Sequence, residues 1–151
     1  MLINKNQIYL NSSITSRDEV LEFISYEASK LGSVTDKERV YQDFLKREKE
    51  YSTALQEGIA IPHAKSEAVK EAKLFFMRLK NDIEWNSPNS FKVKIVFAIL
   101  VPEHEAGTRH IQILSNLAGQ LIDNDFQEQV FNATDKEAVL NLLETVEKES
   151  I

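Results

Sequence analysis

The chain has 151 residues, a formal net charge of -6, 42% hydrophobic and 28% charged residues, and no cysteine. This size and composition are typical of a folded globular protein, so we expect residues 1–151 to form a single domain. The lack of cysteine excludes disulfide bonds, thiolate metal sites and a cysteine nucleophile. The acidic balance argues against broad nucleic-acid binding, which needs clustered Lys and Arg.

The location of the chain follows from its apolar segments. The longest apolar run, residues 93–101, is too short to cross a bilayer and contains Lys94. The amino terminus lacks the pattern of a secretory signal. The absence of cysteine agrees with a reducing compartment. We therefore expect a cytoplasmic protein, without direct membrane insertion, whose partners are proteins or small molecules.

The first third of the chain predicts a short strand and two helices. Residues 8–10 form an apolar run of strand length. Residues 16–19 form a capping box, with Ser followed three residues later by Glu, and apolar residues at helical spacing continue until Gly32 supplies a stop. Residues 35–38 repeat the capping pattern with Thr, which predicts a second helix that ends near Glu48 or Lys49.

The rest of the chain predicts three strands and two more helices. Residues 58–62, 74–79 and 93–101 are apolar, partly β-branched runs of strand length. Two of these runs meet a proline, which cannot donate to a sheet ladder, so we expect strands to stop at Pro62 and Pro102. Thr108 is the predicted N-cap of a helix that extends through Leu121, and residues 134–137 form the last capping box.

These elements together predict the fold class. The apolar runs do not alternate cleanly with polar residues, as expected for strands that are covered on both faces. Helices are available for both faces. The sequence therefore predicts an α/β fold, a three-layer α/β/α sandwich with a central mixed sheet of four to five strands.

Two histidines follow the predicted strands. His63 comes directly after Pro62, and His110 lies in the first turn of the helix that Thr108 begins. In open α/β sheets ligands gather beyond the carboxyl ends of the strands, so we expect both imidazoles at one mouth. The unpaired N–H groups of a helix N-terminus suit an anion. Taken alone, each histidine also has an ordinary explanation, as a polar group at a loop entrance or a solvated side chain of a first turn.

Other polar residues have ordinary roles when they are taken alone. His104 stands between two glutamates and is typical of an exposed loop. Arg47 is by default a surface side chain of a charge-rich helix, and Ser52 and Thr53 are by default loop hydroxyls. Trp85 is predicted to be a core aromatic at a strand edge.

Several known chemistries lack their motifs. The chain has only four glycines and contains neither a dinucleotide-binding nor a nucleotide-triphosphate loop, which argues against an ATP-consuming kinase. No G-x-S-x-G elbow or H-E-x-x-H pair is present. A zinc site built from His63, His104 and His110 remains a geometrical alternative without a motif behind it.

Residues 47–63 resemble the signature of enzyme IIA domains of the fructose/mannitol type, which belong to the bacterial sugar phosphotransferase system. An Arg-Glu pair at 47–48, a Ser-Thr pair at 52–53 and the run Gly-Ile-Ala-Ile-Pro-His at 58–63 recur in this order in that family. The resemblance continues through 83–85, 100–103 and 110–114. The chain departs from the family at 49–51 and 54–57, where it is more charged and lacks a common glycine.

The resemblance implies roles for five residues. His63 corresponds to the phosphorylated histidine, with the phosphoryl group on Nε2 and with Nδ1–H held by an acceptor that the sequence does not reveal. His110 corresponds to the second active-site histidine and Arg47 to the active-site arginine. Ser52 and Thr53 correspond to the hydroxyl pair that binds the phosphoryl group.

The resemblance also implies a phosphotransferase component that needs no cofactor and no metal. Its donor is the phosphohistidine of the carrier HPr and its acceptor is the cysteine of a IIB component, while the membrane component IIC is reached only indirectly. The sugar class is that of fructose, mannitol or galactitol. Because the chain has no cysteine and no membrane span, we expect IIB and IIC to be separate polypeptides or domains.

Alternatives remain open at this point. A regulatory, nitrogen-type IIA phosphocarrier shares the fold and the phosphohistidine, but signals through its phosphorylation state instead of supplying a sugar transporter. A non-catalytic ligand-binding module predicts no acid-labile phosphate, and a zinc hydrolase predicts stoichiometric metal.

Overall fold

The computed structural model describes residues 2–105 and 107–149, with side chains as far as Val146. Position 106 and the ends of the predicted 1–151 domain lie outside the described residues. The helices are α1 (Arg17–Lys30), α2 (Lys37–Glu50), α3 (Arg109–Leu121), α4 (Asn124–Asn132) and α5 (Lys136–Glu149), with short 3-10 turns η1 (Lys5–Gln7) and η2 (Glu103–Glu105). The strands are β1 (Ile8–Ser12), β2 (Ala54–Gln56), β3 (Gly58–Ala60), β4 (His63–Ser66), β5 (Lys73–Glu84) and β6 (Lys92–Pro102).

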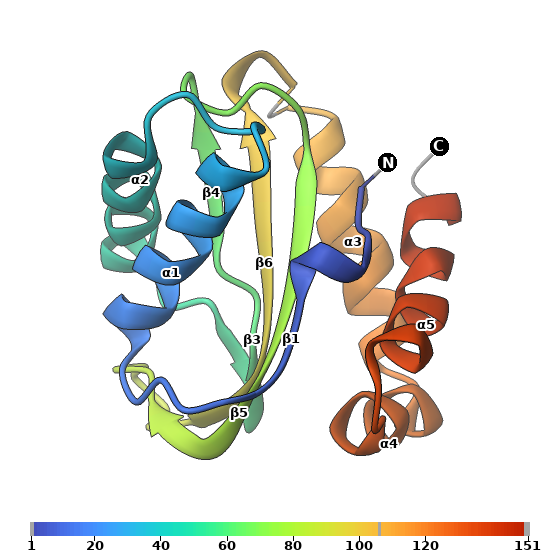
Figure 1. Ribbon diagram of the computed structural model, residues 1–151. Coiled ribbons are helices and arrows are strands. Elements are labelled where there is room, and N and C mark those ends of the chain that lie inside the picture. Colours follow the sequence, from blue (N-terminus) through green and yellow to red (C-terminus); the bar gives the residue numbers. More distant parts are fainter. Residues whose placement is uncertain (1, 106, 150–151) are drawn as a thin grey trace.

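One mixed sheet lies between two helical layers, with α1 and α2 on one face and α3, α4 and α5 on the other (Figure 1). Within the described residues the sheet has six strands in the order β1-β5-β6-β3-β2, and β4 also pairs with β6. The β5–β6 and β2–β3 pairs are antiparallel, whereas β1 pairs with β5 and β3 and β4 pair with β6 in parallel. The predicted three-layer α/β/α fold with a mixed sheet is therefore confirmed.

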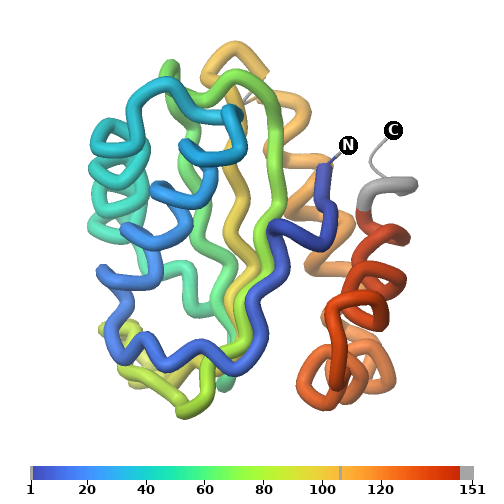
Figure 2. Tube along the Cα trace, viewed as in Figure 1, coloured from blue at the N-terminus to red at the C-terminus, as the bar shows by residue number. Residues whose placement is uncertain are grey.

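The apolar side chains form two cores, one on each face of the sheet. The first is packed between the sheet and α1 and α2 and includes Phe44, Phe75 and Trp85. The second lies under α3, α4 and α5 and includes Phe97 and Leu117. Strands covered on both faces explain why the apolar runs of the sequence do not alternate. The tube in Figure 2 shows the amino-terminal segment running between the sheet and α5, and an ion pair of 2.6 Å joins Lys5 to Glu137 there.

The helix caps agree with the predicted positions to within one residue. Ser16 caps α1 through a hydrogen bond from the Glu19 N–H, as predicted. At α2 the cap is Asp36, which accepts from the Arg39 N–H, while the Thr35 hydroxyl donates to the Ala68 carbonyl instead. An aspartate next to a threonine takes the capping role because it is the stronger N-cap acceptor.

Thr108 stands at the N-cap of α3, as predicted, but its side chain makes no capping hydrogen bond. The helix before it, α2, extends to Glu50, slightly beyond the predicted end. Helix α4 was not predicted. The carbonyls of Val130 and Ala133 at its end accept hydrogen bonds from the Arg78 guanidinium of β5.

The prediction that a strand stops at Pro62 is wrong in one respect. The proline only interrupts the strand, because its carbonyl oxygen still accepts a hydrogen bond from the Ile99 N–H at 2.9 Å. Pairing with β6 then resumes as β4, with His63 opposite Ile99. The additional strand β4, which follows the predicted run 58–62, and the additional edge strand β2 give six strands instead of four to five in the described part of the chain.

Candidate functional site

His63 is the first residue of β4, and two hydrogen bonds fix its ring. Its Nδ1 lies 3.0 Å from the carbonyl oxygen of Ile61, and the Arg47 Nε donates to its Nε2 at 2.9 Å. A carbonyl only accepts and a guanidinium only donates, so the hydrogen must be on Nδ1 and the lone pair on Nε2. The Ile61 carbonyl is the acceptor that the sequence did not reveal.

The surroundings of His63 keep the imidazole neutral. His63 is only 7% exposed, because the chain continues to pair with β6 beyond Pro62. Burial lowers the pKa of His63 from 6.5 to about 4, and its neighbours Arg47, His110 and Lys65 act in the same direction against the opposing Ile61 carbonyl. At neutral pH the Nε2 atom is therefore an unprotonated nitrogen with cations around it.

His110, in the first turn of α3, lies beside His63. The two ring centroids are 4.6 Å apart and the ring planes are inclined at 45°. Burial lowers the pKa of His110, and the charges of Lys65 and Arg47 lower it further. Among the described residues the buried His110 Nε2 has no hydrogen-bond partner. A buried polar atom without a partner is unusual, and this one is next to a nucleophilic nitrogen.

Arg47 is in the last turn of α2, and the backbone beyond the helix holds its side chain. In addition to the bond to His63, its Nη1 donates to the carbonyl oxygen of Tyr51 at 2.5 Å. A pocket of about 330 Å³ opens beside His63; its lining residues are Arg39, Asp43, Lys46, Arg47, Glu50, His63, Lys65 and Glu103. Apart from His63, more basic than acidic residues line this pocket, and the resulting excess of positive charge suits an anionic group.

Ser52 and Thr53 follow α2 and line a second pocket beside His63, of about 440 Å³. The Ser52 Oγ accepts a hydrogen bond from the Ala54 N–H, and no hydrogen bond from its own hydroxyl is found in the described part of the chain. The Thr53 hydroxyl instead donates to the carboxylate of Glu48. The Thr53 hydroxyl is thus engaged inside the protein in this structure, and the predicted bond to a phosphoryl group would require it to release the Glu48 carboxylate.

Sequence reasoning missed Glu48 as a residue of the site. Glu48 is 7% exposed, and its carboxylate accepts from the Thr53 N–H at 3.1 Å and from the Trp85 Nε1–H at 3.3 Å. The Arg-Glu pair of the signature was the available signal, but a glutamate in a charged helix is by default a surface residue. Trp85 is fully buried, as predicted for a core aromatic.

The structure does not bring His104 into this site. His104 is exposed in η2 and lines a different pocket, with Glu67, Val69 and Glu103. No group of three or more His, Cys, Asp or Glu residues that could hold a metal ion occurs among the described residues. The alternative of a zinc site made of His63, His104 and His110 therefore has no geometrical support.

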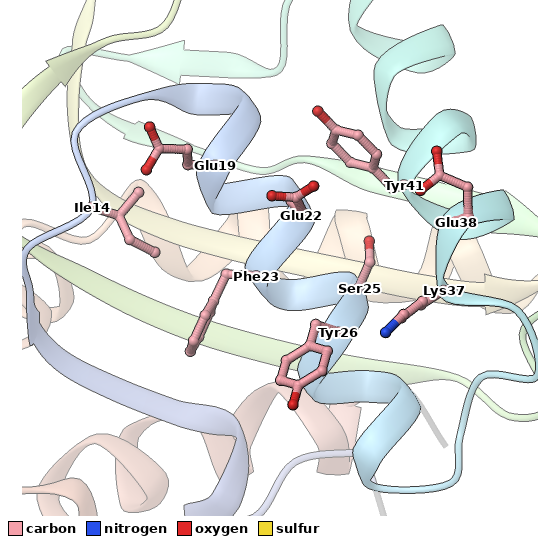
Figure 3. A pocket seen from close by; sticks show the side chains of 9 residues that line it. All are labelled: Ile14, Glu19, Glu22, Phe23, Ser25, Tyr26, Lys37, Glu38 and Tyr41. Carbon is pink, nitrogen blue, oxygen red and sulfur yellow. The ribbon is translucent and has the colours of Figure 1, made fainter.

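A further pocket of about 440 Å³ lies between α1 and α2 and shares no lining residue with the His63 pockets. Figure 3 shows its aromatic side chains Phe23, Tyr26 and Tyr41 together with three glutamates. The Lys37 ammonium stands 4.9 Å from the centre of the Tyr26 ring. This pocket contains no group that resembles the His63 site.

The site agrees with a family of known chemistry. The family described as "Phosphoenolpyruvate-dependent sugar phosphotransferase system, EIIA 2" matches residues 1–146 of this chain. The chain belongs to this family. As an EIIA 2 protein it is a component of the phosphotransferase system, and the resemblance found in its sequence is confirmed.

Relatives of known name support the same assignment. The chain is 33% identical over 139 residues to the fructose-specific EIIA component of Haloferax volcanii. The matched region covers 92% of this chain and 90% of the relative. It is 31% identical over 144 residues to the 2-O-alpha-mannosyl-D-glycerate-specific EIIABC component of Escherichia coli, which covers 95% of this chain. The chain spans only 22% of that larger protein.

Solved structures share the fold of this EIIA 2 protein. Nitrogen regulatory protein IIA-Ntr from Neisseria meningitidis superposes with a TM-score of 0.85 at 28% identity, covering 93% of this chain and 94% of that chain. IIA mannitol from Escherichia coli superposes with a TM-score of 0.79 at 27% identity, covering 95% of this chain and 99% of that chain.

Among the described residues, no helix combines the length and apolar character needed to cross a membrane.

Proposed function

We propose that this EIIA 2 protein is a phosphocarrier that accepts a phosphoryl group on the Nε2 of His63 and passes it to a IIB component for sugar uptake. The observation that carries the proposal is the pair of hydrogen bonds on His63, which leave a neutral ring with its lone pair on Nε2. We propose HPr as the donor. A solved complex of Escherichia coli IIA mannitol with phosphorylated IIB mannitol, whose IIA chain is 26% identical to this one, supports IIB as the partner.

The proposed transfer step needs no activating base. The Nε2 lone pair of His63 attacks the phosphorus, the bond between phosphorus and the donor histidine nitrogen breaks, and the donor ring keeps that electron pair. The Nδ1 hydrogen of His63 stays on its nitrogen and continues to donate to the Ile61 carbonyl. The His63 ring becomes positively charged beside a dianionic phosphoryl group, and these two charges attract one another.

Three other side chains are proposed to bind the phosphoryl oxygens. Arg47 donates to Nε2 in this structure, so it must release that atom and turn to the oxygens as the group arrives. The Nε2 of His110, whose ring lies beside that of His63, has no partner among the residues that the structure describes, and Ser52 lines the second pocket beside His63 with its hydroxyl-bearing side chain. Lys65, which lines the same pocket as His63, adds positive charge.

We place this step in the cytoplasm and treat residues 1–151 as one functional unit. The absence of cysteine, which agrees with a reducing compartment, supports this location. The acceptor cysteine of IIB must come from another polypeptide or domain, because this chain has none.

A regulatory function is the second candidate. It is favoured by the superposition on nitrogen regulatory protein IIA-Ntr with a TM-score of 0.85. Sugar-specific relatives by sequence, such as the 33% identical fructose-specific component, favour uptake. Delivery of the phosphoryl group to a IIB component and then to a sugar separates the two functions, because only an uptake component completes it.

The proposal is tested by incubating the chain with phosphoenolpyruvate, the first enzyme of the system and HPr, followed by mass analysis. We expect one acid-labile phosphoryl group on the wild type and none on His63→Ala. His104→Ala is a matched control that should be labelled fully, because His104 is exposed and outside the site. Labelling of a folded His63→Ala variant would disprove the assignment of His63.

A further inference from the structure

We propose that Glu48 is a positioning residue for phosphoryl transfer, which sets the orientation and tautomer of His63 through Thr53 and Ile61. The inference rests on the proposed function only in so far as His63 is the phosphoryl acceptor. It deepens that function by naming the group that holds the acceptor ring in its reactive form.

Glu48 is a buried acidic residue. Among the described residues it is the only buried acidic side chain, and the structure shows no Lys or Arg paired with it in this part of the chain. A buried carboxylate is unfavourable unless hydrogen bonds compensate for its lost hydration. Three neutral donors do so here: the Thr53 N–H, the Thr53 hydroxyl and the Trp85 Nε1–H.

A chain of hydrogen bonds continues from Thr53 to the His63 ring. The carbonyl oxygen of Thr53 accepts from the Ile61 N–H at 2.9 Å. The carbonyl oxygen of Ile61 in turn faces the Nδ1 of His63 at 3.0 Å. Glu48 therefore holds the backbone of Thr53 in place, and Thr53 in turn holds the backbone of Ile61. The Ile61 carbonyl then keeps the ring hydrogen of His63 on Nδ1.

Both hydrogen bonds on the His63 ring connect to the same turn of α2, one directly through Arg47 and the other indirectly through Glu48. Arg47, which contacts Nε2, is the residue before Glu48 in α2. Arg47 also donates to the carbonyl of Tyr51, so the segment between α2 and β2 is held at both of its ends. A shift of this segment would move the Arg47 donor and the Ile61 acceptor together, and the ring would lose its preference for the Nδ1–H tautomer.

A purely structural role for Glu48 makes a different prediction. If the Glu48 carboxylate only accepted hydrogen bonds from Trp85 and Thr53 inside the core, its removal would lower the free energy of unfolding without changing the tautomer or the reactivity of His63. The two roles are therefore separated by measurements on the His63 ring of folded variants, with thermal unfolding as a separate readout.

The experiment compares Glu48→Ala and Glu48→Gln with Glu38→Ala, an exposed glutamate of the same helix, as the matched control. Nitrogen-15 NMR gives the tautomer and the pKa of His63, and single-turnover transfer from phosphorylated HPr gives the rate. We expect Glu48→Ala to populate the Nε2–H tautomer and to slow transfer about 10- to 100-fold, as when an outer partner of an active-site histidine is lost. Glu48→Gln keeps an acceptor oxygen and should restore most of the rate.

Fluorescence of Trp85, the one tryptophan of the sequence, reports whether the Glu48 contact is lost. If Glu48→Ala does not fold, Trp85→Phe and Thr53→Gly take its place. Trp85→Phe removes a donor to Glu48 and to the Thr53 hydroxyl but leaves both bonds from Thr53 to Glu48 in place, so it should alter the tautomer less than Thr53→Gly, which removes the hydroxyl and loosens the backbone.

A folded Glu48→Ala variant with an unchanged His63 tautomer and an unchanged transfer rate would overturn the proposal, as would an equal effect of Trp85→Phe and Thr53→Gly on the tautomer. The NMR readout needs no phosphoryl donor. Failure of the proposed function, seen as absence of labelling in the wild type, is therefore distinguishable from failure of this inference.

Discussion

At the scale of single residues, the site depends on holding one imidazole neutral. His63 is buried next to the guanidinium of Arg47, the ring of His110 and the charge of Lys65, and each of these disfavours an imidazolium. A neutral ring can attack phosphorus, whereas a protonated ring cannot. The same burial that prepares the nucleophile makes the fold sensitive to acid.

This sensitivity gives a prediction for stability against pH. The folded pKa of His63 is about 4, below its ordinary value of 6.5, so the unfolded chain binds a proton first as the pH falls. Above the ordinary pKa of histidine, His63 does not change the free energy of unfolding. As the pH falls from there toward the folded pKa of His63, this free energy decreases. Between about pH 7 and pH 5, we expect His63 to lower the free energy of unfolding by about 2 kcal/mol.

The measurement is chemical denaturation of the wild type and His63→Ala across this pH range. Because other groups titrate in both proteins, only the difference between the two pH slopes is attributed to His63. Parallel curves for the two proteins would contradict the low pKa of the buried ring.

Arg47 is the second residue whose removal has a defined cost. Its guanidinium contacts Nε2 before transfer and is proposed to bind the phosphoryl oxygens during transfer. Loss of such a donor should cost about 2 to 4 kcal/mol of transition-state stabilisation, which corresponds to about 30- to 1000-fold in rate. We expect Arg47→Ala to show this loss in transfer from phosphorylated HPr. Arg47→Lys keeps the charge without the planar fork and should recover only part of the rate; an unchanged rate in Arg47→Ala would refute the role.

Some residues of the site could be predicted from the sequence, and others could not. The signature pointed to Arg47, His63 and His110, which the structure brings together. It did not reveal the Ile61 carbonyl, because the direction of a backbone carbonyl depends on how the strand passes Pro62. It also missed Glu48, because the burial of this carboxylate depends on Trp85, which is 37 positions away in the sequence.

At the scale of elements, local sequence patterns predicted the helices that are stabilised by interactions between residues close in the sequence. Capping residues and apolar spacing predicted α1, α2 and α5, whose first turns are satisfied by nearby side chains. Helix α4 has few apolar residues in its own sequence, and its last carbonyls are satisfied by Arg78, which is 52 and 55 positions away. Such a distant partner leaves no local pattern.

Gly58, at the turn between β2 and β3, gives a prediction at this scale. Its φ is +89°, a conformation that costs an L-residue about 1 to 2 kcal/mol. A Cβ at this position would also lie 3.0 Å from the Phe131 ring of α4. We expect Gly58→Ala to lower the free energy of unfolding by this backbone cost plus about 1 kcal/mol for crowding.

Gly32 is the matched control for the contact with Phe131. Its φ is +81°, but an added Cβ there would have no atom within 4 Å. Denaturation of both alanine variants therefore separates backbone strain from crowding. Equal losses in the two variants would show that Phe131 moves aside without cost.

At the scale of the whole molecule, the site joins the two helical layers across the sheet. Arg47 comes from α2 on one face, His110 from α3 on the other, and His63 from β4 between them. The two apolar cores therefore fix the distance between the rings of His63 and His110 indirectly. A charge that arrives on His63 is consequently felt on both faces of the sheet.

This arrangement leads to a prediction for His110. Burial and nearby cations lower its pKa in the unphosphorylated protein, and the positive end of the α3 dipole also disfavours a second positive charge. A dianionic phosphoryl group on His63 would reverse this balance, because attraction favours protonation of a ring whose Nε2 has no partner among the described residues. We therefore expect the pKa of His110 to rise on phosphorylation, and its hydrogen bond to the phosphoryl group to strengthen.

The test is to titrate His110 by NMR in both forms and to measure transfer in His110→Ala. We expect the variant to be labelled on His63, since that nitrogen is the acceptor, but to exchange the group with HPr and IIB more slowly. His110→Gln keeps a donor that cannot become charged, so it should restore positioning without the response to phosphorylation. If the His110 pKa stayed the same after phosphorylation and His110→Ala transferred at the wild-type rate, the ring would be only a packing neighbour of His63.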